Sequence, residues 1–223
     1  SFKTSLSGIY VTSNSNFCVE GNFETTADFE NNGKMYVGGS FTGSKLYPGN
    51  GSQTTIEKNL TLKNDFKTEG ELYVGGNLKA QNLYFGSQVY INGDANISNN
   101  TYKTITESAN VFIGGNLTAG DFQHNQGSTT NVQGENGLDI SKKDVTINGT
   151  VNFAGKFIAK TIALQGTTDF YACGIETSGN FRIDSNSANL HTGYLKAASI
   201  YQCAGSKIYL NDKGYVECEG TYE

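Results

Sequence analysis

The residues best suited to chemistry in this 223-residue chain are few and scattered. The sequence contains four cysteines and two histidines, and no two cysteines form a Cys-x-x-Cys pair. This spacing does not suit a zinc site. The acids Asp139, Asp144, Asp184 and Asp212 share no repeated position, and Arg182 is the only arginine. Because polysaccharide-cleaving sites need clustered acids, we expect no catalytic residue, no metal and no cofactor.

Two of the cysteines have a spacing that suits a bond between them. Cys203 and Cys218 each lie two residues before a glycine, Gly205 and Gly220. If both glycines mark the same position in adjacent repeats, the two sulfur atoms would be neighbours. Two interpretations are open, a Cys203–Cys218 disulfide or two buried free thiols.

The overall composition excludes several classes of partner. The formal net charge is −5 without any lysine or arginine run, which argues against nucleic-acid binding. No stretch is apolar for the roughly 18 residues that a membrane span needs. The chain is rich in Asn, Ser, Thr and Gly, which disfavours helices. This bias is common on secreted proteins, so we expect an extracellular or cell-surface location.

A short glycine-centred motif repeats along the chain and must position everything else. The string Val74-Gly75-Gly76-Asn77-Leu78 returns nearly unchanged at residues 37–41 and 113–117. Its second glycine recurs about every 18 residues, with Lys58 replacing it in one copy. The register passes through Gly134 and Gly166 and predicts structural corner glycines at Gly21, Gly39, Gly76, Gly93, Gly115, Gly149 and Gly179.

Apolar residues flank each anchor glycine with a period of two, which is typical of β-strands. An antiparallel sandwich need not repeat the same residue type at aligned positions, whereas a stacked coil does. A left-handed hexapeptide helix needs an apolar residue every six positions, and Thr25 and Asn31 break that register. We therefore predict an all-β, single-stranded parallel β-helix (a β-solenoid), right-handed, with about 10–12 rungs of roughly 18 residues. It should span residues 1–223 continuously, with loop insertions near residues 43–55, 98–110 and 120–144.

Glycine suits a corner that another turn of the coil approaches closely, because it has no Cβ. The residue after it is short and polar in most copies, so stacked rungs would align these side chains in a ladder. This column is either a polar binding face or a structural ladder, and we favour the ladder. Its predicted members are Asn22, Asn59, Asn77, Asp94, Asn116 and Asn180.

The strings Tyr73-Val74-Gly75-Gly76-Asn77-Leu78 and Phe112-Ile113-Gly114-Gly115-Asn116-Leu117 resemble those of repeat-rich bacterial β-helix proteins. Such strings are found in surface and pilus-associated proteins, and short-rung coils of this kind resemble the polymer-forming bactofilins. The resemblance implies a non-catalytic structural, adhesive or filament-forming role. The chain differs from bactofilins in its irregular rungs and long inserts.

Two functions follow as hypotheses. The first is an extracellular structural or adhesive β-solenoid, a segment of a surface fibre or filament that self-associates or contacts cell-surface glycans. The sequence ends inside a motif, so either more chain follows or the last rung stacks on another molecule. The alternative is a carbohydrate-binding or carbohydrate-cleaving β-helix, for which an aromatic groove could use Tyr84, Tyr90, Tyr102 and Tyr194.

Overall fold

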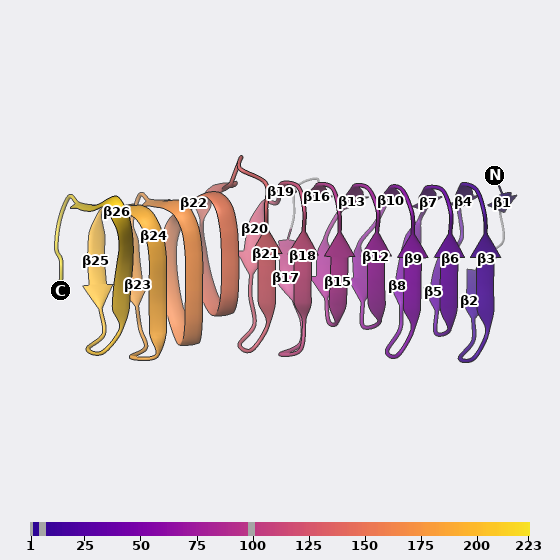
Figure 1. The fold of residues 1–223 in the computed structure, drawn as a ribbon, viewed down its shortest axis with the longest axis horizontal. Helices are drawn as coiled ribbons and strands as arrows, with labels where there is room; N and C mark the ends of the chain where they lie inside the picture. Colours follow the sequence, from indigo (N-terminus) through magenta and orange to yellow (C-terminus); the bar gives the residue numbers. More distant parts are fainter. Residues whose placement is uncertain (1, 5–7, 98–100) are drawn as a thin grey trace.

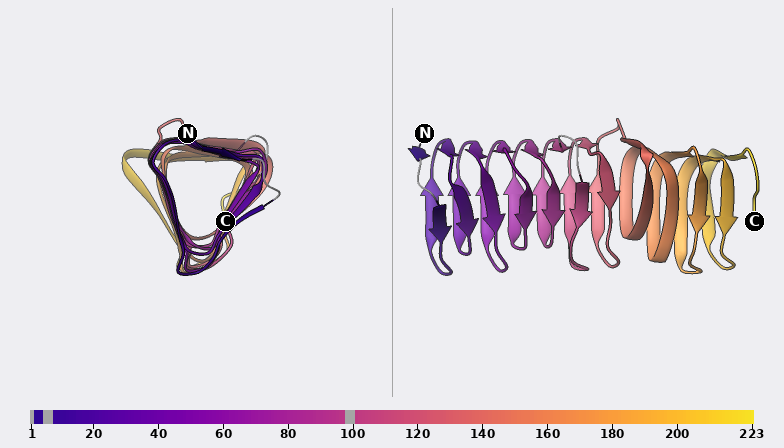
Figure 2. Two further views of the ribbon diagram at one scale, coloured as in Figure 1. Left: turned by 90° about the vertical axis from the view of Figure 1, so that its right-hand side faces the viewer. Right: turned by 180° about the vertical axis from the view of Figure 1, so that it is seen from behind.

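The computed structural model describes residues 2–4, 8–97 and 101–223. The fold prediction is confirmed: the described chain is all-β, with parallel sheets stacked as a β-solenoid of about 11 turns and rungs of about 19 residues. Viewed down its axis, the coil has a triangular outline (Figure 2). None of the described residues forms a helix that could cross a bilayer.

In the first seven rungs, each turn of the coil places one short strand on each of three faces. Face A consists of β1 (Phe2–Thr4), β4 (Phe23–Thr25), β7 (Phe41–Gly43), β10 (Leu60–Leu62), β13 (Leu78–Ala80), β16 (Ala95–Ile97) and β19 (Leu117–Thr118). Face B consists of β2 (Gly8–Val11), β5 (Asp28–Asn31), β8 (Lys45–Pro48), β11 (Phe66–Thr68), β14 (Leu83–Phe85), β17 (Thr101–Thr104) and β20 (Asp121–Gln123). Face C consists of β3 (Asn16–Val19), β6 (Lys34–Val37), β9 (Gln53–Ile56), β12 (Glu71–Val74), β15 (Gln88–Ile91), β18 (Asn110–Ile113) and β21 (Thr129–Val132).

The chain runs from face C to face A, then to face B, and back to face C one rung later. We call the bends between these faces corner 1 (C to A), corner 2 (A to B) and corner 3 (B to C). In Figure 1 the face C strands point upward on the near side, the chain returns down the far side, and successive rungs lie further left. This is the sense of a right-handed coil.

The last third of the chain keeps the coil but uses much longer strands. Its elements are β22 (Leu138–Thr177), β23 (Asn180–Ile183), β24 (Ala188–Ala197), β25 (Ser199–Gln202) and β26 (Lys207–Cys218). With 40 residues against rungs of about 19, β22 passes around the coil about twice. Figure 1 shows β22 as a continuous band, in contrast to the separate arrows of the first rungs.

A single hydrophobic core fills the tube. Alternate residues of each strand point inward, and one cluster of buried apolar side chains extends from Val11 to Ile200. Near the N-terminal end it contains Phe23, Phe29 and Phe41, with the partly buried Phe17 packed against them. The contacting rings have centroids 5.1–5.9 Å apart in tilted and edge-to-face arrangements. Each added rung therefore buries its apolar residues against the previous one.

The three predicted loop insertions are mostly strands of the coil. Residues 43–55 include the end of β7, all of β8 and the start of β9, and only residue 44 and residues 49–52 lie between strands. Residues 98–100 lie outside the described residues, while the rest of 98–110 contains β17 and the start of β18. Residues 120–144 contain β20, β21 and the start of β22. The repeated motif includes only the face C strand, corner 1 and the face A strand, so it did not indicate the strands of face B within these segments.

Candidate functional site

Corner 1 contains a ladder of side-chain hydrogen bonds between rungs. In each step the backbone N–H of one ladder residue donates to a side-chain oxygen of the ladder residue one rung earlier. The bonds with carboxamide or carboxylate acceptors run from Ser40 to Asn22 (2.9 Å), Asn77 to Asn59 (2.8 Å), Asp94 to Asn77 (2.8 Å), Asn116 to Asp94 (2.7 Å) and Asn136 to Asn116 (3.1 Å). The Asn59 N–H donates to the Ser40 hydroxyl at 3.3 Å and joins the first of these steps to the ones that follow.

The same side chains explain the second glycine of the motif. A Cβ at Gly39, Gly76, Gly93, Gly115 or Gly134 would overlap the Oδ1 atom of the ladder residue one rung earlier. Lys58 is the exception, and the ladder residue before it is Ser40, whose side chain is shorter. Glycine is therefore required where the previous rung carries Asn or Asp, and a larger residue fits above Ser. Gly21 precedes Asn22 at the start of this column.

Three predicted members of the column lie elsewhere. Gly149 lies inside β22 at corner 3, with a φ of +83° and the Ser128 carbonyl directly behind it. Gly179 lies at corner 2, where its N–H donates to the Lys160 carbonyl at 2.8 Å. Asn180 begins β23 and pairs with Ser199. A strand whose alternate side chains face inward precedes every corner of the coil. The sequence motif therefore could not distinguish one corner from another.

The predicted disulfide is absent, because Cys18, Cys173, Cys203 and Cys218 are all free. Cys203 is exposed in the connection at corner 3, whereas Cys218 ends β26 and is partly packed against the core. The proposed pairing assumes that Gly205 and Gly220 occupy the same corner, but these glycines lie at different corners. The interpretation of both as buried thiols is wrong for Cys203, whose side chain faces solvent.

The acids and the arginine do not converge on one site. The Arg182 Nε atom contacts Asp184 at 2.9 Å on the surface. Asp144 accepts hydrogen bonds from Thr161 at 2.8 Å and from Lys160 at 3.3 Å. No group of three His, Cys, Asp or Glu side chains suited to a metal ion occurs in the described part of the chain.

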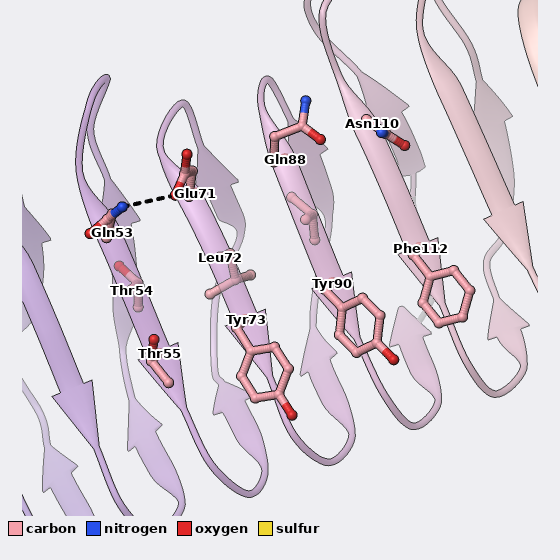
Figure 3. Close-up of a pocket in the computed structure, with 11 residues that line it drawn as sticks. Gln53, Thr54, Thr55, Glu71, Leu72, Tyr73, Gln88, Tyr90, Asn110 and Phe112 are labelled. Atoms are coloured by element: carbon pink, nitrogen blue, oxygen red, sulfur yellow. Dashed lines mark hydrogen bonds between the residues drawn. The ribbon is translucent and has the colours of Figure 1, made fainter.

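The outer side of face C has a shallow groove of about 480 Å³ along several rungs. One edge is an aromatic strip, which we define as Tyr73, Tyr90 and Phe112. Tyr73 and Tyr90 have ring centroids 5.4 Å apart and planes within 8°, and Tyr90 and Phe112 have centroids 4.7 Å apart and planes within 9°. Figure 3 shows the three rings side by side with their faces open to the viewer.

A row of polar side chains forms the other edge of the groove (Figure 3). It contains the first residue of four consecutive face C strands, namely Gln53, Glu71, Gln88 and Asn110. All four are exposed, and Gln53 donates from Nε2 to a Glu71 carboxylate oxygen at 3.1 Å. Strand pairing keeps both rows in register, since Tyr73 lies opposite Tyr90 and Tyr90 opposite Phe112.

Only one of the four predicted groove tyrosines belongs to this strip. Tyr90 is at its centre, whereas Tyr102 is fully buried in the core and so cannot meet a ligand. Tyr84 lies on face B, and Tyr194 lies in β24 at the far end of the coil. Sequence reasoning missed Tyr73 and Phe112, although each precedes the same Val/Ile-Gly-Gly-Asn-Leu motif by one residue. That shared position was the signal that could have found them.

A buried polar network lies inside the coil where the short strands give way to long ones. The Tyr102 hydroxyl contacts Thr130 Oγ1 at 2.5 Å, and that oxygen lies 3.0 Å from His124 Nε2. The other ring nitrogen of His124 contacts the Asn148 carbonyl, and the Ser128 hydroxyl lies 3.3 Å from both ring nitrogens. Burial lowers the pKa of His124 to about 4, against the opposing effect of the Asn148 carbonyl. The ring is therefore neutral near pH 7 and belongs to the core.

Comparisons with known proteins identify no family for this chain. No protein-family model, no curated protein and no solved structure matches the chain.

Proposed function

We propose that this chain is a non-catalytic structural or adhesive β-solenoid located outside the cell, as a segment of a surface fibre or filament. The observation that supports this best is the unbroken stacking of rungs around one core from Val11 to Ile200. Each inner rung is hydrogen-bonded to the rungs on both sides, which favours a stiff rod. A stiff rod suits a protein that spans distance or displays a surface.

The last rung supports self-association as part of this proposal. β26 pairs only with β24 among the described strands, so its outer edge has free backbone groups. Leu210 and Val216 are 38% and 36% exposed, although comparable positions of inner rungs are covered. A further rung, from a continuation of the chain or from a second copy, would cover these side chains.

The proposal is tested by the shape, association and adhesion of the purified chain. Small-angle scattering should give a rod profile, and its length should increase with protein concentration. Leu210→Lys combined with Val216→Lys should abolish that increase without changing the rod profile of the monomer. A chain that remains monomeric at high concentration and adheres to no cell surface would contradict the proposed role.

A carbohydrate-binding or carbohydrate-cleaving β-helix is the second candidate. The specific observation in its favour is the groove on face C, where exposed rings line one edge and amide side chains line the other. Aromatic faces and amide groups are the side chains that bind sugar rings and their hydroxyls. A reducing-end assay on polysaccharides distinguishes cleavage from binding alone.

A further inference from the structure

We propose that the groove on face C binds a neutral, extended polysaccharide that lies along the axis of the coil. The aromatic strip would stack against successive sugar rings, and the row of Gln53, Glu71, Gln88 and Asn110 would bind their hydroxyl groups. This inference rests on the proposed adhesive function and names the ligand class and the face that would serve it.

The repeat of the coil explains why an extended polymer fits. Neighbouring rungs of a parallel sheet are about 4.8 Å apart, so a side chain at one register position returns at that interval. The observed ring spacings of 5.4 and 4.7 Å follow from this and resemble the advance of one pyranose ring along an extended chain. A linear glycan could therefore make the same contact on each rung.

The outward sides of the rings are accessible to a sugar, although neighbouring rings are stacked and cover part of each other's faces. Tyr73 and Tyr90 are 38% and 39% exposed, Phe112 is half-buried, and Figure 3 shows the three rings on the outer side of face C. No lysine or arginine lines this groove. The apolar C–H groups of a sugar can therefore approach the rings without displacing a cation.

The polar row favours a neutral ligand. Three of its four members are carboxamides, which both donate and accept hydrogen bonds, as sugar hydroxyls do. Glu71 is the one charged member, and its negative charge would repel uronic acids or sulfated sugars. The groove therefore selects uncharged hydroxyl-rich polymers over anionic ones.

Two other aromatic stacks on the surface lack these properties. Tyr171, His191 and Tyr209 stack at 4.2 and 4.5 Å, but the Lys207 ammonium group lies over the Tyr209 ring at 6.0 Å. Tyr194 and Tyr215 stack at 5.5 Å, and Lys156 and Lys196 lie over their rings at 5.6 and 5.8 Å. The rings of these stacks are partly occupied by cations, so the strip on face C is the better sugar-binding surface.

Affinity electrophoresis in gels that contain a single soluble polysaccharide tests the inference. The probes are neutral β-glucans, a xylan, a mannan and a galactan, with alginate and hyaluronan as anionic polymers. The intact chain should be retarded by at least one neutral polymer and by neither anionic one. Replacing Tyr73, Tyr90 and Phe112 together by Ala should weaken that binding by at least roughly tenfold.

Two further variants keep the test decisive. Tyr171→Ala with Tyr209→Ala is the matched control, because it removes two stacked rings from another part of the surface and should leave retardation unchanged. Gln88→Ala with Asn110→Ala changes only exposed side chains, and it should weaken binding even if the triple ring variant fails to fold. The inference is overturned if no neutral polymer retards the chain, or if these groove variants bind as the intact chain does. Adhesion to cells without glycan binding would overturn the inference and leave the proposed adhesive role intact.

Discussion

The two parts of the coil turn corner 1 in different ways. Up to β21 the strands are two to four residues long, and in the Gly-Gly motifs a pair of glycines and a ladder residue separates face C from face A. From β22 onward, strands of 40, 10 and 12 residues continue through corners. There a single glycine marks corner 1, at Gly155, Gly174, Gly193 and Gly214. The same triangular coil is therefore built with two kinds of corner (Figure 1).

The difference lies in which group accepts the backbone N–H at the corner. In the first part, the Asn77 and Asp94 N–H groups donate to side-chain oxygens of the preceding rung. The backbone ladder is interrupted there and each strand ends. Among the described residues, the later corners have no Asn or Asp ladder of this kind, and the strands run on. Corners with side-chain acceptors therefore separate short strands, whereas the later corners lie within or between longer ones.

Gly75→Ala should be the most damaging change, because a Cβ there would overlap the carbonyl of Glu57 in the preceding rung. The clash involves backbone on both sides, so we expect a loss of about 3 kcal/mol in the free energy of unfolding. Gly174→Ala is the counterpart in the second part, where the atoms nearest to the new Cβ belong to the side-chain ring of Tyr194. A side chain can shift more readily than backbone, so the loss in the free energy of unfolding should be clearly smaller for Gly174→Ala. Urea denaturation measures both, and equal losses would contradict the distinction between the corners.

Acid should weaken the boundary between the two parts. His124 has a folded-state pKa of about 4, below the value of about 6.5 expected in the unfolded chain. The unfolded state therefore binds the proton more readily, so this stability is present above about pH 6.5 and is lost as the pH falls toward 4. The loss should be on the order of 2–3 kcal/mol. Denaturation curves at pH 7 and pH 4 measure this loss in the free energy of unfolding. His124→Gln should remove most of the difference between the two pH values that is due to the histidine.

The pairing of Ser40 with Lys58 can be tested by a double-mutant cycle. Ser40→Asn should introduce the carboxamide that other rungs have, which would overlap the Cβ of Lys58 and cost about 1–2 kcal/mol. Lys58→Gly in the same chain should recover the lost stability, because glycine leaves room for Oδ1 of the new asparagine. If the two substitutions are simply additive in the free energy of unfolding, the steric account of the ladder is wrong.

The smallest effect is expected from removing one side-chain acceptor. Asn77→Ala leaves the Asp94 N–H without its 2.8 Å partner, at an exposed site where water can replace it. We expect a loss of about 1 kcal/mol, typical of a single hydrogen bond. Hydrogen exchange of the Asp94 amide should become faster, while amides of β24 stay unchanged. Unaltered exchange at Asp94 would show that the ladder does not protect the corner.

Much of the first part was predictable because each motif combines two strands and a distinctive corner. The alternation around Gly39, Gly76 and Gly115 gave the correct neighbours on faces A and C. Phe41 pairs with Leu60, for example, and Leu72 with Val89, as the aligned columns predict. Face B was missed because its strands lie at variable distances from the motif. Tyr102, taken as a surface residue, points into the core from β17.

Past Val132 the sequence register no longer follows the structure. The pattern aligns Val145 with Thr130, yet Thr130 pairs with Val151. It likewise places both Asn136 and Leu138 inside, whereas Asn136 is exposed and only Leu138 is buried. Because the rungs have unequal lengths, glycines occur at all three corners. Without the Asn ladder, the local sequence does not indicate at which corner a given glycine lies.

The sequence by itself determined that this protein is a parallel coil with glycine corners, because periodicity and steric requirements are local properties. Only the tertiary structure decided which side chains became neighbours across rungs. The strip of Tyr73, Tyr90 and Phe112 and the contact between His124 and Thr130 depend on the exact number of residues in each turn. That number is set by how well each rung packs on the one before it.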